Sequence, residues 1–287
     1  MVATGETVPL AAGLYFVATP IGNARDITLR ALDILASADV LVAEDTRTLR
    51  RLMDIHGIPV NGRTVLPYHD HNGAQMRPRL LEAIRDGKSV AYASDAGTPL
   101  IADPGFGLGR EVAQQGLSIT TAPGASSAIA ALTLSGLPSD RFVFAGFAPT
   151  GAGARESFLK ELADITGTVI LFESPKRVGK LLSAAAQVFG EEREAAVCRE
   201  LTKKFEEVRR GSLGELAEAY QNEQPKGEIV VCIAKGEKKV DEADVRAALA
   251  ARLETMKLKA AANAVAEEFG LSKRDIYQIG LEIQNRD

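Results

Sequence analysis

Four short segments rich in glycine, proline and small polar residues carry the residue types best suited to binding a ligand. They are ATPIGN, AEDTR, SDAGTPLIADPG and APGASS, at residues 18–23, 43–47, 94–105 and 122–127. Glycine lets the backbone approach a ligand closely, and N–H groups at helix starts lack helical partners. Each segment follows a short apolar run typical of a strand, and ligands of open α/β sheets bind beyond the carboxyl ends of the strands. The segments therefore predict one binding site along one edge of a sheet.

The ligand at this edge is not expected to be a dinucleotide or a polyphosphate. The chain has no GxGxxG followed about 20 positions later by an acidic residue, and no GxxxxGK[ST]. The segments carry few cations, which suits S-adenosylmethionine with its adenosine and its sulfonium charge, although composition alone does not select it. Asp95 is a candidate contact to the polar end of such a ligand, and an Asx-type turn would explain it equally well.

The elements that position these segments follow from the apolar pattern. We expect strands at residues 14–19, 40–43, 89–94 and 117–122, and helices at residues 28–36, 46–55, 75–85, 106–115 and 126–134. Apolar strands that alternate with helices indicate a parallel sheet covered on both faces. The sequence thus predicts an α/β domain over residues 13–138, preceded by a tail at residues 1–12 without the features of a signal peptide.

A second α/β domain is expected over residues 139–236. Its strands fall at residues 142–147, 168–173, 195–201, 206–211 and 228–234, and the close spacing of several suits antiparallel pairing in a mixed sheet. Residues 237–287 predict a helical appendage in which Gly270 and Ser272 suit a helix end and a helix start. The form is that of a helix-turn-helix, or simply of two packing helices. Nine basic and nine acidic residues from Lys238 onward give DNA binding no support.

Composition limits the remaining possibilities. The 287 residues carry a net charge of −4 and are 46% hydrophobic, which predicts a globular protein that does not coat nucleic acid by bulk electrostatics. Cys198 and Cys232 lie in apolar runs and are typical of core residues in a reducing compartment, so we expect a cytoplasmic protein. No metal site is expected, because neighbouring side chains of His69, Asp70 and His71 would point apart.

Read in order, the motifs resemble a known family. GLYFVATPIGNARDITLRALDIL, AEDTRTLRRLMDIHGI, YASDAGTPLIADPG, APGASSAIAALTLSGLPSDRFVFAGFAP, ESPKRV, RELTKKFEEVRRG and KGEIVV are similar to the ribosomal RNA small-subunit ribose 2′-O-methyltransferase I family, of tetrapyrrole methylase-like fold. The similarity extends from about Gly13 to Ala234, and the tail resembles the family's helical appendage. The resemblance implies two α/β domains with S-adenosylmethionine in the cleft between them. It further implies methylation of a cytidine 2′-hydroxyl in the decoding region of small-subunit ribosomal RNA, within the small ribosomal subunit, by a homodimer.

The resemblance also suggests site residues. The positions that it implies for the cofactor are Pro20, Ile21, Gly22, Asp95, Ala96, Gly97, Thr98, Pro99, Leu100, Ile101, Ser126, Ser127, Leu201, Gly227 and Glu228. For contact with RNA phosphates the candidate cations are Arg47, Arg50, Lys176, Arg177, Lys203 and Lys204. The sequence departs from the family's pattern at Gly73, at residues 149–155 and at Lys176, which affects RNA contacts more than the cofactor site.

A ribose hydroxyl is a poor nucleophile, so a positioned base should speed its methylation by about 10²–10⁴-fold. The candidates are Glu44, Asp45 and Lys203, the last only if a dry cleft lowers its pKa. Either carboxylate could instead pair with Arg47 or cap the following helix, and Lys203 could instead bind RNA phosphate. Two rival functions remain open: methylation of a tetrapyrrole by the same fold, and non-catalytic nucleic-acid binding by the C-terminal helices.

Overall fold

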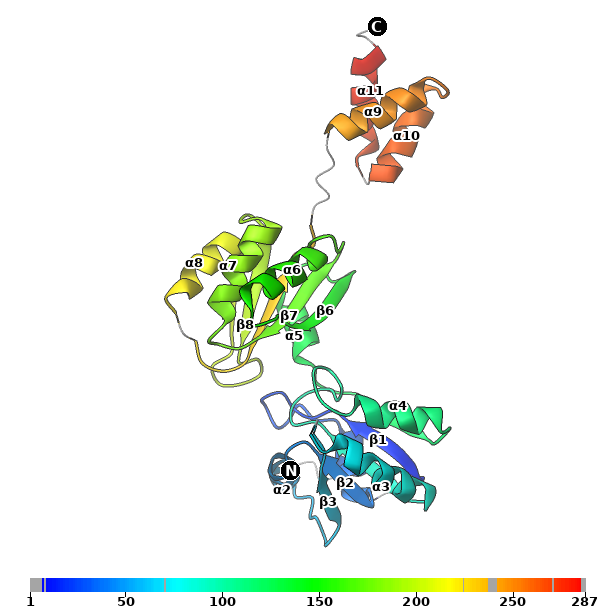
Figure 1. The fold of residues 1–287 in the computed structure, drawn as a ribbon, viewed down its shortest axis with the longest axis vertical. Coiled ribbons are helices and arrows are strands. Elements are labelled where there is room, and N and C mark those ends of the chain that lie inside the picture. Colours follow the sequence, from blue (N-terminus) through cyan, green and yellow to red (C-terminus); the bar gives the residue numbers. More distant parts are fainter. Residues whose placement is uncertain are drawn as a thin grey trace. The chain divides into compact units, whose positions relative to one another are not determined.

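The first of two five-stranded sheets is entirely parallel. The computed structural model describes residue 7 and residues 9–69, 71–223, 225–236, 242–269 and 271–284. The strands are β1 (Gly13–Val17), β2 (Val40–Ala43), β3 (Thr64–Pro67), β4 (Ser89–Ala93) and β5 (Ile119–Ala122), in the order β3-β2-β4-β1-β5. The sheet therefore brings the loops that follow β1, β2, β4 and β5 to one edge, as the sequence predicts (Figure 1).

Two apolar cores cover the two faces of this sheet. Helices α1 (Leu29–Ser37) and α2 (Thr46–Ile55) bury leucines and Met53 against one face. Helices α3 (Gly73–Arg85) and α4 (Phe106–Gln114) pack on the other, around Tyr92. The sequence did not predict β3, since this strand has only four residues, lies half-buried at the sheet edge and ends in Pro67.

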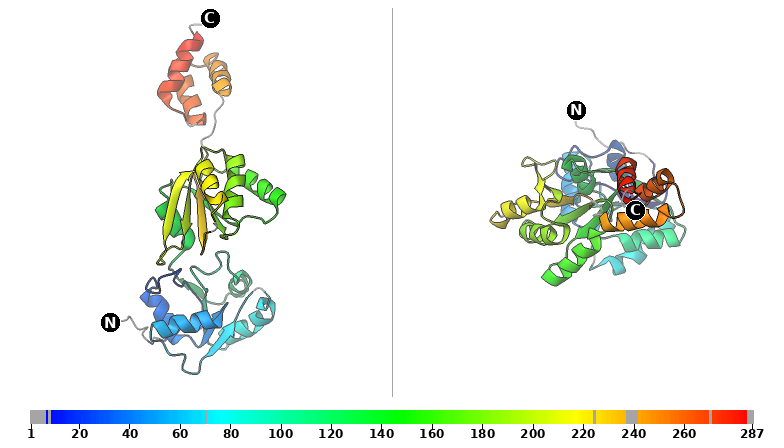
Figure 2. Two further views of the ribbon diagram at one scale, coloured as in Figure 1. Left: turned by 90° about the vertical axis from the view of Figure 1, so that its left-hand side faces the viewer. Right: turned by 90° about the horizontal axis from the view of Figure 1, so that it is seen from above.

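The second sheet is mixed, as predicted. Its strands are β6 (Phe142–Phe147), β7 (Thr168–Glu173), β8 (Glu194–Arg199), β9 (Glu207–Ser212) and β10 (Ile229–Ile233), in the order β6-β7-β10-β8-β9. Only the β6–β7 pair is parallel. Helices α6 (Ala152–Ala163), α7 (Val178–Phe189) and α8 (Leu213–Gln221) gather on one face, as Figure 2 shows.

Helix α5 (Ser127–Ser135) covers the opposite face of the second sheet. We expected this helix in the first domain, which was to end at residue 138. Instead Ala131 and Leu132 pack against Ile170 of β7 and against β8 and β10, the strands that carry Cys198 and Cys232. The second sheet offers an apolar face to α5 there. The chain therefore leaves the first sheet just before α5, near residue 126.

The chain divides into two compact units, residues 1–235 and residues 236–287. Helices α9 (Glu242–Leu253), α10 (Leu258–Phe269) and α11 (Lys273–Gln284) surround a small core that includes Val265 and Ile276. Ser272 directly precedes α11, where its carbonyl accepts bonds from the Asp275 and Ile276 N–H groups. Gly270, the expected helix end, lies outside the described residues. Among the helices that the structure describes, none combines the length and apolar character needed to cross a membrane.

Candidate active site

A cavity of about 440 Å³ lies between loops that follow strands of both sheets. Many of the residues predicted to bind the cofactor line it: Ile21, Asp95, Ala96, Gly97, Thr98, Ile101, Ser126, Ser127, Gly227 and Glu228. The first eight come from three of the four glycine- and proline-rich segments, and the last two from the start of β10. Three of the four loops that sequence analysis singled out therefore share one hollow, and residues 43–47 lie outside its lining.

The other predicted cofactor residues, Pro20, Gly22, Pro99, Leu100 and Leu201, lie outside the cavity lining. Gly22 stands so close to the loop after β8 that a Cβ atom there would come within 2.5 Å of Lys203 Cγ. Leu201 is buried in the same apolar cluster as Ile21. Leu100 packs near Tyr92, while Pro20 and Pro99 are half-buried and buried respectively.

Hydrogen bonds tie the glycine- and proline-rich segments to one another. Thr19 and Gly97 exchange backbone bonds of 2.9 and 3.0 Å. The Thr98 hydroxyl donates to the Ala125 carbonyl at 2.9 Å. Asp95 Oδ1 accepts the Asp45 N–H at 2.9 Å, so this side chain stabilises a neighbouring loop as well as lining the cavity. The cavity floor is thus held in place by bonds between segments far apart in sequence.

Sequence reasoning missed about half of the lining. The missed residues are Ala102, Asp103, Phe147, Phe172, Glu173, Ser174, Pro175, Ile229 and Val230. Several lie at the ends of β6 and β7 or directly after β7, so applying the strand-end rule to the second sheet would have found them. Phe147 and Phe172 stand edge to face with ring centroids 5.6 Å apart, and they give the cavity an aromatic wall.

Asp103 is the most perturbed acid of the cavity. Burial raises its pKa to about 6, and the negative charges of Glu44 and Asp95 add to the effect. An aspartate with this pKa can take up and release a proton near neutral pH. Beneath it the Tyr92 hydroxyl donates to the Pro104 carbonyl at 2.7 Å, and burial raises the pKa of this phenol.

The predicted bases Asp45 and Lys203 are both engaged in other interactions. Asp45 caps α2 by accepting the Arg47 N–H at 2.8 Å, and its bonds to the Arg47 side chain and backbone lower its pKa to about 2. Burial alone would lower the pKa of Lys203, but its hydrogen bonds to Glu200 (2.8 Å) and Glu228 (3.0 Å) outweigh burial and raise it. The condition under which Lys203 was expected to act as a base is therefore not met.

The predicted RNA-binding cations differ in how their charges are used. Arg177 pairs with the buried carboxylate of Glu173, with 2.7 Å from Nε to Oε1. Lys204 lies over the exposed Phe205 ring at 5.5 Å from its centroid. Arg47, Arg50 and Lys176 are all exposed, and the Arg47 side chain, 88% exposed, pairs with Asp45. The cations of this group are therefore not equally free to meet phosphate.

The described residues contain no group of three or more histidine, cysteine, aspartate or glutamate side chains placed to hold a metal ion. The His69 and His71 rings stand edge to face at 5.9 Å. Asp70, the middle residue of that sequence, lies outside the described residues. Both cysteines are buried as free thiols in the second sheet.

Comparison with known proteins agrees with this geometry. Residues 13–217 match the tetrapyrrole (corrin/porphyrin) methylases, and residues 239–284 match the RsmI C-terminal HTH domain. The ribosomal RNA small subunit methyltransferase I of Mesorhizobium japonicum is 47% identical over 96% of this chain and 94% of its own length. That of Vibrio cholerae is 41% identical over 96% of this chain and 97% of its own.

Solved structures place the fold. A cobalamin biosynthetic enzyme, cobalt precorrin-4 methyltransferase, superimposes with a TM-score of 0.57 at 20% identity, over 77% of this chain and 94% of its own. At this identity the likeness concerns the fold alone, and it agrees with the two α/β sheets and the cavity between their loops. The sequence relatives go further, because they cover nearly the whole chain at 40% identity or more. This chain belongs to the ribosomal RNA small subunit methyltransferase I family and has the tetrapyrrole methylase fold.

Proposed function

We propose that this protein transfers a methyl group from S-adenosylmethionine to the 2′-hydroxyl of a cytidine in the decoding region of small-subunit ribosomal RNA. The observation that carries the proposal is the cavity itself, because several of the family's motif loops converge on it from both sheets. The sequence relatives are named for methylation of small-subunit ribosomal RNA, which supports the choice of substrate. The described structure gives no comparable support to a tetrapyrrole substrate beyond the shared fold.

The residues present suit this cofactor. A cavity of about 440 Å³ is in the range of small-molecule sites, and apolar side chains such as Ile21, Phe172 and Ile229 can enclose a flat adenine. Asp95 and Asp103 put negative charge on the lining, which favours a ligand with a sulfonium and an ammonium group. Ser126, Ser127 and Thr98 add polar atoms that can hold the ribose.

The chain's own contribution to the chemistry is positioning and proton transfer. When bound, S-adenosylmethionine would supply a methyl carbon attached to a positively charged sulfur. The ribose oxygen bonds to this carbon while the carbon–sulfur bond breaks, and the sulfur keeps the electron pair of that bond. Holding the hydroxyl in line with that carbon is worth up to about 7–11 kcal/mol of the barrier. The hydroxyl proton passes to a carboxylate of the chain, and Asp103 suits this role because its pKa is about 6 and it lines the cavity.

The same proposal covers the assembly and the setting. We expect a homodimer acting on assembled small subunits in the cytoplasm, as the family resemblance implies. Exposed apolar side chains of β5 and α5, namely Ile119, Ile129 and Leu134, offer a surface for the second copy. Light scattering of the purified protein measures the dimer, and a monomer at micromolar concentration would contradict this part.

The decisive experiment uses labelled S-adenosylmethionine and small subunits from a strain that lacks the modification. We expect label in the ribosomal RNA, resistant to alkali at one cytidine because a 2′-O-methyl group blocks cleavage there. Label in a porphyrinoid and never in RNA would favour the tetrapyrrole rival. Calorimetry on a chain ending at Gly236 tests the second rival, non-catalytic nucleic-acid binding by the C-terminal helices. If that fragment binds the cofactor, function through the C-terminal helices alone is excluded.

The cofactor site is tested by substitution. Asp95→Ala and Thr98→Ala each remove a lining group that also ties two loops together, so both should weaken S-adenosylmethionine binding several-fold. Arg79→Ala, which changes an exposed side chain of α3, serves as the control. Unchanged affinity in both cavity variants would show that the cofactor binds elsewhere.

A further inference from the structure

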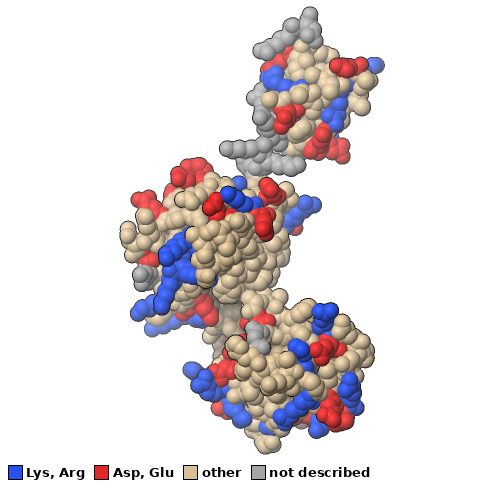
Figure 3. Space-filling model, viewed as in Figure 1, with Lys and Arg blue, Asp and Glu red and all other residues tan. Residues whose placement is uncertain are grey.

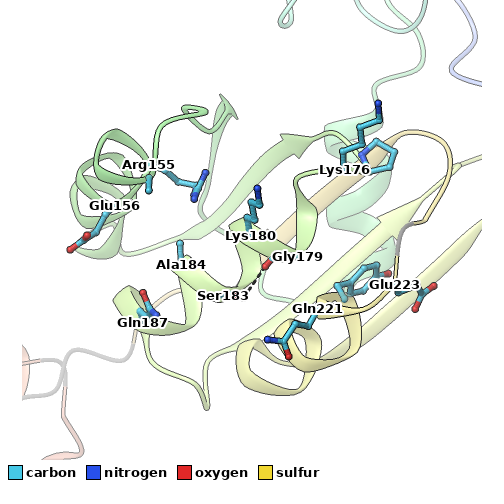
Figure 4. Close-up of a pocket in the computed structure, with 13 residues that line it drawn as sticks. Arg155, Glu156, Lys176, Gly179, Lys180, Ser183, Ala184, Gln187, Gln221 and Glu223 are labelled. Carbon is cyan, nitrogen blue, oxygen red and sulfur yellow. Dashed lines mark hydrogen bonds between the residues drawn. The ribbon is translucent and has the colours of Figure 1, made fainter.

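A second cavity, of about 530 Å³, lies among α6, α7 and the end of α8. Three cations line it: Arg155 from α6, Lys176 from the loop after β7, and Lys180 from the first turn of α7. Figure 4 shows the Arg155 guanidinium directed toward Lys180, with Lys176 further along the same side. Basic side chains also gather on this α/β half in the space-filling view (Figure 3).

Arg155 is unusual because its charge is buried without a counter-charge. The residue is only 9% exposed, and its Nε is buried without a hydrogen-bond partner. Among the described residues, the one hydrogen bond of its side chain runs from Nη1 to the Thr150 carbonyl at 3.2 Å, and the side chain joins no ion pair. A buried charge without a partner is costly. An anion in the cavity would remove that cost.

The carboxylates at the cavity do not supply this anion, because each has its own cation. Glu156 pairs with Lys160 at 2.7 Å, and Glu223 pairs with Arg209 at 2.5 Å. Lys176 and Lys180 are exposed and join none of the ion pairs found in the described part of the chain. The cavity therefore presents three positive charges that have no ion-pair partner among the described residues.

We propose that this cavity binds a backbone phosphate of the RNA strand, an inference that rests on the proposed function for the identity of the strand. The planar guanidinium of Arg155 matches phosphate oxygens, and the two lysines add point charges. Pro175 lines both this cavity and the cofactor cavity, so the two sites adjoin. A phosphate held here would fix the strand beside the nucleotide whose ribose enters the cofactor cavity.

The first test removes the exposed cations. Lys176→Ala/Lys180→Ala should weaken binding of a single-stranded oligoribonucleotide on the order of tenfold at low salt. It should also reduce the slope of log affinity against log salt by up to about 0.7, because each phosphate of a single strand that is no longer neutralised removes about 0.7. The matched control is Arg79→Ala/Lys88→Ala, which removes two exposed cations of the first α/β half. Equal losses in both variants would overturn the proposal.

The second test addresses the buried arginine. Arg155→Met keeps an unbranched side chain without charge, so the free protein should melt about 2–4 °C higher while oligoribonucleotide affinity falls. A lower melting temperature with unchanged affinity would mean that Arg155 only supports the fold, and would overturn its role. S-adenosylmethionine affinity should stay at the wild-type value in every variant.

Failure of this inference is distinguishable from failure of the proposed function. If the wild-type protein methylates ribosomal RNA but the cation variants bind and methylate it normally, the phosphate site is wrong and the activity stands. If the wild-type protein methylates no RNA, the proposed function is wrong. The oligoribonucleotide measurements then still decide whether the cavity binds phosphate.

Discussion

Asp103→Asn offers a test that links the electrostatics of the cavity to stability and to activity. The pKa of Asp103 rises from an ordinary 3.8 to about 6, chiefly because of burial. A difference of about two pKa units corresponds to about 3 kcal/mol, since each unit is worth about 1.4 kcal/mol. Asp103 keeps some contact with solvent, so we expect about 1–3 kcal/mol. The amide has nearly the same shape and cannot ionise, so the substitution should remove this cost.

The sign of the effect depends on pH. The folded protein holds the Asp103 proton more tightly than the unfolded chain, so the folded state binds more protons between pH 3.8 and about 6. The free energy of unfolding therefore falls as pH rises through this interval. Near pH 4 the free energy of unfolding of Asp103→Asn should equal that of the wild type. At pH 8 it should be higher by the full amount of about 1–3 kcal/mol.

Urea unfolding at pH 4, 6 and 8 measures this difference, and methylation assays supply the functional half. The wild-type kcat/KM should rise with pH up to about 6 and then level off, because the proton acceptor must be ionised. Asp103→Asn should lower kcat by about 10²–10⁴-fold. A stability gain that is the same at pH 4 and pH 8 would refute the burial argument. Near-normal kcat in the variant would refute the role in proton transfer.

Three further predictions concern the framework of the cavity. Gly22→Ala should lower the melting temperature and S-adenosylmethionine affinity together, since a Cβ there would overlap the loop after β8; circular dichroism and calorimetry measure both. Arg177→Met leaves the buried Glu173 carboxylate without its ion-pair partner and should cost about 3–5 kcal/mol in urea unfolding, whereas unaltered stability would mean that the pair is weak. Thr98→Val deletes the bond to the Ala125 carbonyl, about 1 kcal/mol, and should weaken cofactor binding about fivefold without unfolding the protein.

The arrangement of the first sheet and its loops could be predicted because local sequence and topology agree there. Short apolar strands that alternate with helices permit few arrangements, and parallel strands place their following loops on one edge. The predicted helix at residues 46–55 begins and ends where α2 does, and Asp45 caps it as one of the two readings of that residue anticipated. What remained hidden were features that depend on the path of the chain rather than on residue type.

Asp103 illustrates the hidden part. Its loop turns back on itself through left-handed backbone at Leu100 (φ 72°) and Ala102 (φ 62°), a conformation that neither residue type suggests. This path brings Asp103 beside Asp95 of the same loop and Glu44 of the loop after β2. Lys203 is a second example. Its positive charge is evident from the sequence, but its ion pair with Glu228, 25 residues further along the chain, is not.

The distribution of charge over the two adjoining cavities has a physical logic. Carboxylates attract a methyl donor with a sulfonium, while cations attract an RNA strand. Carboxylates and cations that touch would pair with each other, as Lys203 does with Glu228. Keeping Asp103 in one cavity and Arg155 in the other preserves both attractions. Arg177 pairs with the buried Glu173, so this carboxylate of the cofactor cavity is already compensated. If donor and strand bind as proposed, the separation should show as different salt responses: RNA affinity should fall steeply with ionic strength, whereas affinity for the small cofactor should change much less.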